Sequence, residues 1–137
     1  MKQNNHQDLA VSILRIALGI NIFLHGVVRF GANYSKFITW ITDTFKDAPL
    51  PTWSVVAFAY AIPPVEATVG LLLIFGVFML PTMLTGLGLM IVLMAGSCLI
   101  QNWEIVGLQM IYILLYTTVL FFFNYNHYSV DVLVRKK

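Results

Sequence analysis

The sequence predicts an all-α polytopic membrane protein, an antiparallel bundle of four transmembrane helices with a short amphipathic helix in the first outer loop. Hydrophobic residues make up 59% of the 137 residues, charged residues make up 10%, and the mean hydropathy is +0.83. A soluble domain of this size cannot bury so much apolar surface, so part of its solvent must be lipid. Four apolar segments are each long enough to cross a hydrocarbon core of about 30 Å, which takes ~20 helical residues.

The four apolar segments cover approximately residues 9–30, 54–80, 82–100 and 105–123. A short turn around Pro81 joins the second segment to the third, and residues 101–104 join the third to the fourth. Because short turns force neighbouring helices to run antiparallel, we expect an up-and-down bundle. The chain has no low-complexity stretch, and we expect residues 1–137 to form a single transmembrane domain.

The one long connection, residues 31–53, has a helical pattern of its own. Apolar side chains recur on one side from Tyr34 to Ala48, polar side chains lie opposite, and Pro49 and Pro51 then end the pattern. We therefore expect a short amphipathic helix on the outer surface. Two interpretations stay open, an anchor in the headgroup layer and a lid over the mouth of the bundle.

Basic residues at the two ends of the chain predict its orientation. Lys2 precedes the first span and residues 135–137 follow the last. On the opposite side, Lys36 and Lys46 are offset by the acidic residues Asp43, Asp47 and Glu104. Because basic residues stay in the cytoplasm, we expect both termini to be cytoplasmic. The net charge of +2 forms no basic stripe for nucleic acid, so the lipid bilayer is the expected partner.

Strongly polar side chains interrupt the first two apolar segments. Asn21, His25 and Arg29 recur every four residues and therefore share one helical face. A charge in the bilayer core costs at least ~2.5 kcal/mol, so residues of this kind mark functional sites. In the second segment, Glu66 follows Pro63-Pro64, which break the helical hydrogen-bond ladder and leave carbonyl groups without donors.

Polar groups on separate helices reach similar depths in the outer half of the bilayer, at ~1.5 Å of rise per residue. We therefore expect them to line one cavity that binds a ligand. Its candidate residues are Asn21, His25, Arg29, Glu66, Gln109 and Tyr112. His25 and Glu66 are the best candidates for catalytic groups, because imidazole exchanges protons near neutral pH. Structural interpretations stay open as well: Glu66 neutralises Arg29 or binds the freed carbonyls, and His25 is an interhelical hydrogen bonder.

Arg15 lies on the same face of the first segment but near its cytoplasmic end. An unpaired arginine at this depth has to extend its side chain to the interface. We therefore expect a structural ion pair between Arg15 and Asp131, or between Arg15 and Asp8.

Cysteine and histidine usage limits the chemistry that the chain performs unaided. Cys98 is the only cysteine, so the chain forms neither an internal disulfide nor a dithiol redox pair. Only one of the three histidines, His25, lies inside an apolar segment. A haem held by two histidines within the bundle and a closed zinc site are therefore not expected, and we predict neither a metal nor a built-in cofactor.

Three stretches of the chain carry motifs of a known family. Residues 14–30 contain a Leu-Arg-x-x-x-Gly … His-Gly pattern, and residues 66–76 read Glu-x-x-x-Gly-Leu-Leu-Leu-x-x-Gly. A closing Ser-x-Asp lies at Ser129 and Asp131, and Arg29 stands where a lysine is often found. With these motifs the chain resembles the DoxX family of small four-span bacterial membrane proteins.

The resemblance implies a location in the bacterial inner membrane and a link to quinol oxidation or thiosulfate–quinone oxidation. On this basis we expect a subunit or accessory of a quinone-linked oxidoreductase whose outer cavity binds a quinone-like or other small amphiphile. A redox protein or a second copy of the chain would be its partner. The alternative is a non-catalytic structural membrane subunit or a small-solute carrier. A carrier needs polar residues that continue to the cytoplasmic side, where Arg15, Thr82 and Thr85 are the candidates.

Overall fold

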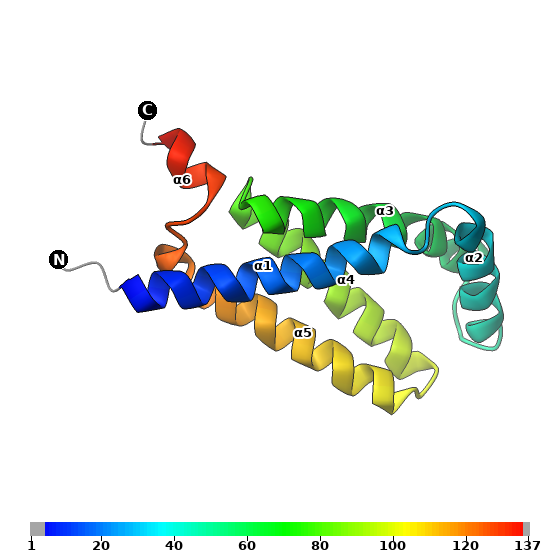
Figure 1. Ribbon diagram of the computed structural model, residues 1–137. Helices are drawn as coiled ribbons and strands as arrows, with labels where there is room; N and C mark the ends of the chain where they lie inside the picture. Colours follow the sequence, from blue (N-terminus) through cyan, green and yellow to red (C-terminus); the bar gives the residue numbers. More distant parts are fainter. Residues whose placement is uncertain (1–4, 136–137) are drawn as a thin grey trace.

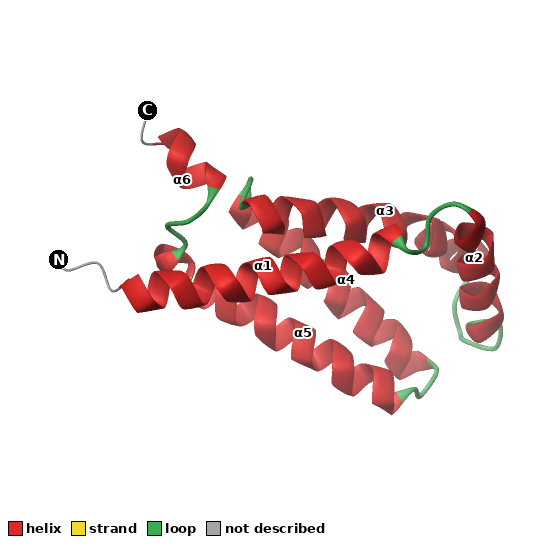
Figure 2. Ribbon diagram, in the orientation of Figure 1, coloured by secondary structure: helices red, strands yellow, loops and turns green. Residues whose placement is uncertain are grey.

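Four long apolar helices dominate the computed structural model, which describes residues 5–135 (Figure 1). The elements are α1 (Asn5–Val27), α2 (Ala32–Thr44), α3 (Thr52–Phe75), α4 (Met79–Leu99), α5 (Trp103–Phe121), the short 3-10 helix η1 (Phe123–Tyr125) and α6 (Val130–Arg135). Within that range the chain is helical with loops between the helices, and no strand is present (Figure 2). Helices α1, α3, α4 and α5 are long and apolar enough to cross a membrane, which confirms the predicted four-span helical fold.

The helices pair as α1 with α3 and α4 with α5. Glycines bring the first pair close together, because a Cβ atom on Gly26 would collide with the backbone of Pro63 and Ala67. In the same way, Gly70 of α3 lies against the backbone of Phe23 of α1. Close approach of backbones at small residues is the usual way in which helices associate in lipid, where helix contacts gain nothing from excluding water.

The second pair, α4 and α5, meets at Gly86, which lies directly against the phenol ring of Tyr116. Leu18, Leu73 and Met83 are buried in the core between the two pairs. Figure 1 shows that α4 and α5 diverge from α1 toward the end of the bundle at which α2 lies. We call this end the α2 end, and we call the end near both termini the α6 end.

The turn between α3 and α4 lies several residues before the predicted position at Pro81. Gly76 ends α3 in the left-handed conformation (φ 68°, ψ 47°), and its N–H donates to the carbonyl of Leu72 at 2.8 Å. Glycine adopts this conformation without steric cost and commonly ends helices. Pro81 instead occupies the first turn of α4. The first N–H groups of a helix have no intrahelical acceptor, so proline is tolerated there.

Helix α2 forms as predicted from residues 31–53 and lies across the end of the bundle (Figure 1). One hydrogen bond ties it to α3: the Tyr34 hydroxyl donates to the carbonyl of Tyr60 at 2.5 Å. Because Pro64 has no N–H, the Tyr60 carbonyl lacks its intrahelical donor. Tyr34 therefore supplies, from another helix, the donor that the proline removed.

Helix α6 was not predicted, and the segment before it folds back over the α6 end of the bundle (Figure 1). The Asp131 carboxylate accepts hydrogen bonds from the backbone N–H groups of Phe78 at 2.9 Å and Met79 at 2.7 Å. Its own N–H donates to the carbonyl of Gly76 at 3.1 Å. Asp131 thus caps the N-terminus of α4, where a negative charge also interacts favourably with the helix dipole.

Candidate functional site

Polar side chains of α1 and α5 meet on an exposed face of the bundle. Tyr112 of α5 donates a hydrogen bond to the Asn21 Oδ1 atom of α1 at 2.8 Å. The His25 ring lies edge-on to the Tyr112 ring, with 6.4 Å between ring centroids and an interplanar angle of 72°. Asn21 and His25 are both exposed. We call these three residues, Asn21, His25 and Tyr112, the polar seam.

A second polar group lies beside the turn after α1, at the α2 end. Arg29 forms an ion pair with Glu66 of α3, whose side chain is 4% exposed, whereas that of Arg29 is 25% exposed. The Arg29 guanidinium also lies 4.5 Å from the centroid of the Phe37 ring of α2, in a cation–π geometry. Arg29 is placed this way because α1 ends at Val27 rather than at Phe30 as predicted.

The structure therefore matches one of the two structural interpretations of Glu66. Its carboxylate binds Arg29, and the freed carbonyl of Tyr60 is bound by Tyr34 instead. A paired carboxylate inside a membrane helix keeps its charge without facing hydrocarbon alone. Glu66 consequently joins α3 to the turn between α1 and α2.

Two polar atoms of α5 are buried with no hydrogen-bond partner among residues 5–135, namely Gln109 Oε1 and the Tyr116 hydroxyl. A hydroxyl in an apolar medium without a partner costs about 2–7 kcal/mol, so such groups normally find one. Gln109 is one of the predicted site residues, whereas Tyr116 is not among them. Its spacing of four residues from Tyr112 is the signal that places it on the same face of α5.

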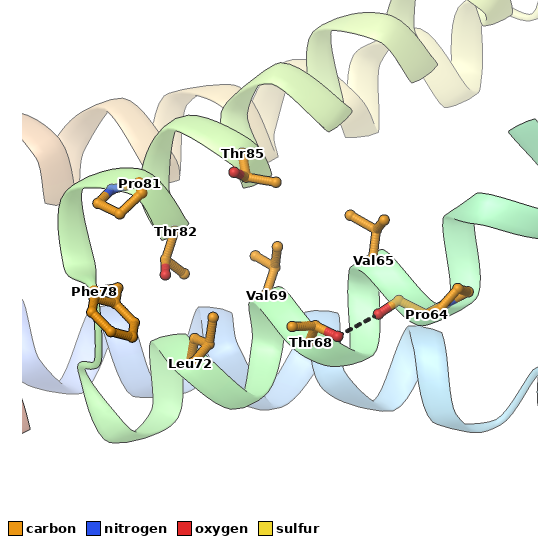
Figure 3. Close-up of a pocket in the computed structure, with 9 residues that line it drawn as sticks. All are labelled: Pro64, Val65, Thr68, Val69, Leu72, Phe78, Pro81, Thr82 and Thr85. Atoms are coloured by element: carbon orange, nitrogen blue, oxygen red, sulfur yellow. Dashed lines mark hydrogen bonds between the residues drawn. The ribbon is translucent and has the colours of Figure 1, made fainter.

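The cavity expected between His25 and Glu66 stays a prediction. Two apolar cavities lie beside α3, and none of the six predicted ligand-binding residues lines either of them. The larger, about 510 Å³, lies between α3 and α4 (Figure 3) and is lined by Pro64, Val65, Thr68, Val69, Leu72, Phe78, Pro81, Thr82 and Thr85. The smaller, about 240 Å³, lies among α2, α3 and α4 at the α2 end.

Arg15 is buried at the α6 end, with 1% of the residue exposed. Its Nη2 atom donates to the carbonyl of Tyr128 at 2.8 Å, and its guanidinium packs against Gly76, where a Cβ atom would collide with it. Within the described range, its Nε and Nη1 atoms have no hydrogen-bond partner.

The structure does not form the ion pair that the sequence suggested for Arg15. Asp131 donates its N–H to the carbonyl of Gly76 and uses its carboxylate to cap α4. Asp8, the alternative partner, contacts His127 instead, with 2.7 Å between Oδ1 and Nδ1. Arg15 and Asp131 thus belong to one cluster without direct pairing among the described side chains. Sequence spacing alone could not show that Arg15 would bind a backbone carbonyl and that Asp131 would bind the N-terminus of α4, instead of binding each other.

The fold and these polar groups define a class, the four-span helical membrane proteins with polar side chains held within their spanning helices. The DoxX family model matches residues 10–99, about two thirds of the chain, and the chain belongs to the DoxX family. The match contains α3, α4 and most of α1, including His25 and Glu66, whereas α5 and the Ser129–Asp131 motif lie beyond it. Comparison with curated proteins and with solved structures finds no match.

Proposed function

We propose that the protein binds the polar head of a quinone-like or other small amphiphile at the polar seam, as a component of a membrane redox system. One observation carries the proposal: Asn21 and His25 are exposed within a spanning helix. Lipid tails offer such groups no hydrogen-bond partner, and polar side chains in spans normally face a neighbouring helix or a ligand pathway.

The chemistry of the polar seam suits a ligand that carries hydrogen-bond acceptors. Asn21 uses its Oδ1 atom to accept from Tyr112, which leaves its Nδ2 group as a donor toward the exposed face. His25 supplies a ring N–H beside it. The carbonyl oxygens of a quinone are acceptors that match these donors, and the tail of such a ligand would remain among the lipid chains.

His25 is the residue to which we assign proton exchange with the ligand, because imidazole changes its charge near neutral pH. Glu66 takes a different role in this proposal, since Arg29 holds its carboxylate. The single cysteine gives the chain no dithiol pair. We therefore assign the electron transfer to a partner redox protein, in line with the quinone-linked systems that the DoxX resemblance implies.

The orientation belongs to the same proposal. Both termini face the cytoplasm of a bacterium and the α2 end faces outward, as the basic residues at the two ends of the chain suggest. The polar seam then opens to the outer half of the inner membrane.

A second candidate function, a non-catalytic structural membrane subunit, is favoured by the Arg29–Glu66 pair. This pair joins α3 directly to the turn after α1. The two candidates differ in what they require of His25, because a structural subunit has no need for an exposed imidazole.

The test is a calorimetric titration of the detergent-solubilised protein with decylubiquinone as the probe. We expect saturable binding to the wild type, and a dissociation constant at least about tenfold higher for His25→Leu and for Asn21→Leu. Tenfold corresponds to about 1.4 kcal/mol, the worth of one hydrogen bond at a desolvated site.

Thr117→Val is the matched control for these variants. Thr117 is also an exposed polar residue of a spanning helix, but its hydroxyl donates to the carbonyl of Ile113 in its own helix. Its substitution should leave the dissociation constant unchanged. Absence of saturable binding to the wild type, or equal dissociation constants in all four proteins, would contradict the proposal.

A further inference from the structure

The smaller cavity, about 240 Å³, lies at the α2 end of the bundle and has an apolar lining. We call it the chamber. Three helices and the loop after α2 line it, and it opens to the surface where Phe58, Val92 and Leu99 are exposed. Its lining consists of Ile41, Phe45, Leu50, Ser54, Val55, Phe58, Ile62, Val92, Leu93, Ala95, Gly96 and Leu99. None of these residues belongs to the polar seam or to the Arg29–Glu66 pair.

The lining offers water almost nothing to bind. Ser54 is its only polar side chain, and the Ser54 hydroxyl already donates to the carbonyl of Pro51 at 2.7 Å. A buried water needs two to four polar partners, and cavities lined by aliphatic and aromatic groups stay dry. The chamber is therefore suited to hydrocarbon.

The walls of the chamber are held in place from two sides. The hydrogen bond from Tyr34 to the Tyr60 carbonyl ties the N-terminal half of α2 to α3. At the other end of α2, the Phe45 ring packs beside Gly96 of α4, where a Cβ atom would come within 3.3–3.4 Å of the ring. Gly96 thus makes room for Phe45 without closing the space beside it.

The side chains around the chamber are those of a membrane interface. Trp40 is 60% exposed and Trp53 is 75% exposed at this end of the bundle, as expected for aromatic residues at headgroup depth. Lys46 directly follows Phe45 in the chain, and Asp43 and Asp47 accompany it, all three exposed. One cation with neighbouring carboxylates complements both the phosphate and the ammonium group of a zwitterionic lipid head.

We propose that this chamber binds one acyl chain of a zwitterionic bilayer phospholipid, whose headgroup lies beside Lys46. The apolar lining favours a hydrocarbon chain, and at the membrane interface the available hydrocarbon is that of lipid. The mixed charges of Lys46, Asp43 and Asp47 favour a zwitterionic headgroup. The proposal goes beyond the function proposed above and does not rest on it, because the polar seam shares no residue with the chamber.

Native mass spectrometry of protein released from phosphatidylethanolamine nanodiscs tests the proposal. We expect one retained phosphatidylethanolamine per chain in the wild type. Ala95→Phe and Val92→Phe should each lower its occupancy at least tenfold by filling the chamber. Ile91→Phe is the matched control, because Ile91 is an exposed residue of the same helix outside the lining, and it should retain the lipid.

Competition on the unmodified protein provides a test that needs no variant to fold. Lysophosphatidylethanolamine, with one chain, should displace the bound lipid, whereas glycerophosphoethanolamine, with none, should not. Nanodiscs that also contain phosphatidylglycerol should still give mainly bound phosphatidylethanolamine. Equal retention in the chamber-filling and control variants, displacement by the chain-free headgroup, or preferential retention of phosphatidylglycerol would each overturn the proposal.

Discussion

The two ends of the bundle treat their polar side chains in opposite ways. At the α6 end, Arg15 and Asp131 turn inward and bind backbone groups of the segment around α6 and of the start of α4. At the α2 end, Asn21 and His25 remain exposed on a spanning helix. The difference suggests that polar residues within a span are structural where they are buried against the chain's own backbone, and mark a ligand site where they remain exposed.

The Arg29–Glu66 pair should give the largest effect on stability. Glu66 is buried, and replacing one member of the pair leaves the charge of the other without its partner. We expect Glu66→Gln to lower the free energy of unfolding by about 3 kcal/mol, the lower end of the range for removing one partner of a buried ion pair. The lower end applies because Arg29 is partly exposed and can reach polar surroundings. Unfolding in mixed micelles at increasing denaturing detergent measures the change.

Glu104→Gln serves as the control for this measurement, since Glu104 is exposed and takes part in no ion pair among the described residues. If Glu66→Gln instead kept full stability and abolished ligand binding, Glu66 would belong with His25 as a site residue. The contrast drawn between paired and exposed polar groups would then fail.

The cap on α4 comes next in size. Asp131→Ala removes two charge-assisted hydrogen bonds from the N-terminus of α4, and we expect a loss of about 1–2 kcal/mol in the free energy of unfolding. The charge swap Arg15→Asp with Asp131→Arg should not restore stability, because the two side chains do not pair directly. A swap that recovered most of the loss would show that the ion pair predicted from the sequence forms in the membrane.

The bond between Tyr34 and Tyr60 should have the smallest effect. Tyr34→Phe removes a single hydrogen bond, worth about 1 kcal/mol, and should raise hydrogen exchange in residues 32–44. In a Pro64→Ala background the Tyr60 carbonyl can accept from the new N–H of residue 64, so the same substitution should change exchange much less. Equal effects of Tyr34→Phe in both backgrounds would mean that the proline does not create the need for Tyr34.

The fold could be predicted from the sequence because lipid imposes one simple requirement. Every spanning backbone must satisfy its own hydrogen bonds, so length and hydropathy are sufficient to find the four helices. The amphipathic spacing of residues 31–53 likewise predicted α2. The turn after α3 differs from the prediction at Pro81, because Gly76 ends the helix and proline is compatible with the first turn of α4.

The polar partners were harder to predict, because their choice depends on contacts between distant parts of the chain. The sequence showed that Pro64 frees a carbonyl, but not that Tyr34 would reach it from α2. It placed charges at Arg15 and Asp131, but not the backbone groups that bind each of them. That His25 and Glu66 share a ligand cavity stays a prediction. In the structure, the Glu66 carboxylate forms an ion pair with Arg29.

Photolabelling with an azido-quinone tests most directly whether the exposed polar seam, rather than the buried cluster at the α6 end, holds a ligand. The protein would be labelled in nanodiscs, and the modified residues located by mass spectrometry. The account predicts labels within residues 18–27 of α1 and 106–116 of α5, reduced in His25→Leu and retained in Thr117→Val. Labels concentrated at residues 126–134, or spread evenly over the lipid-facing surface in all three proteins, would contradict it.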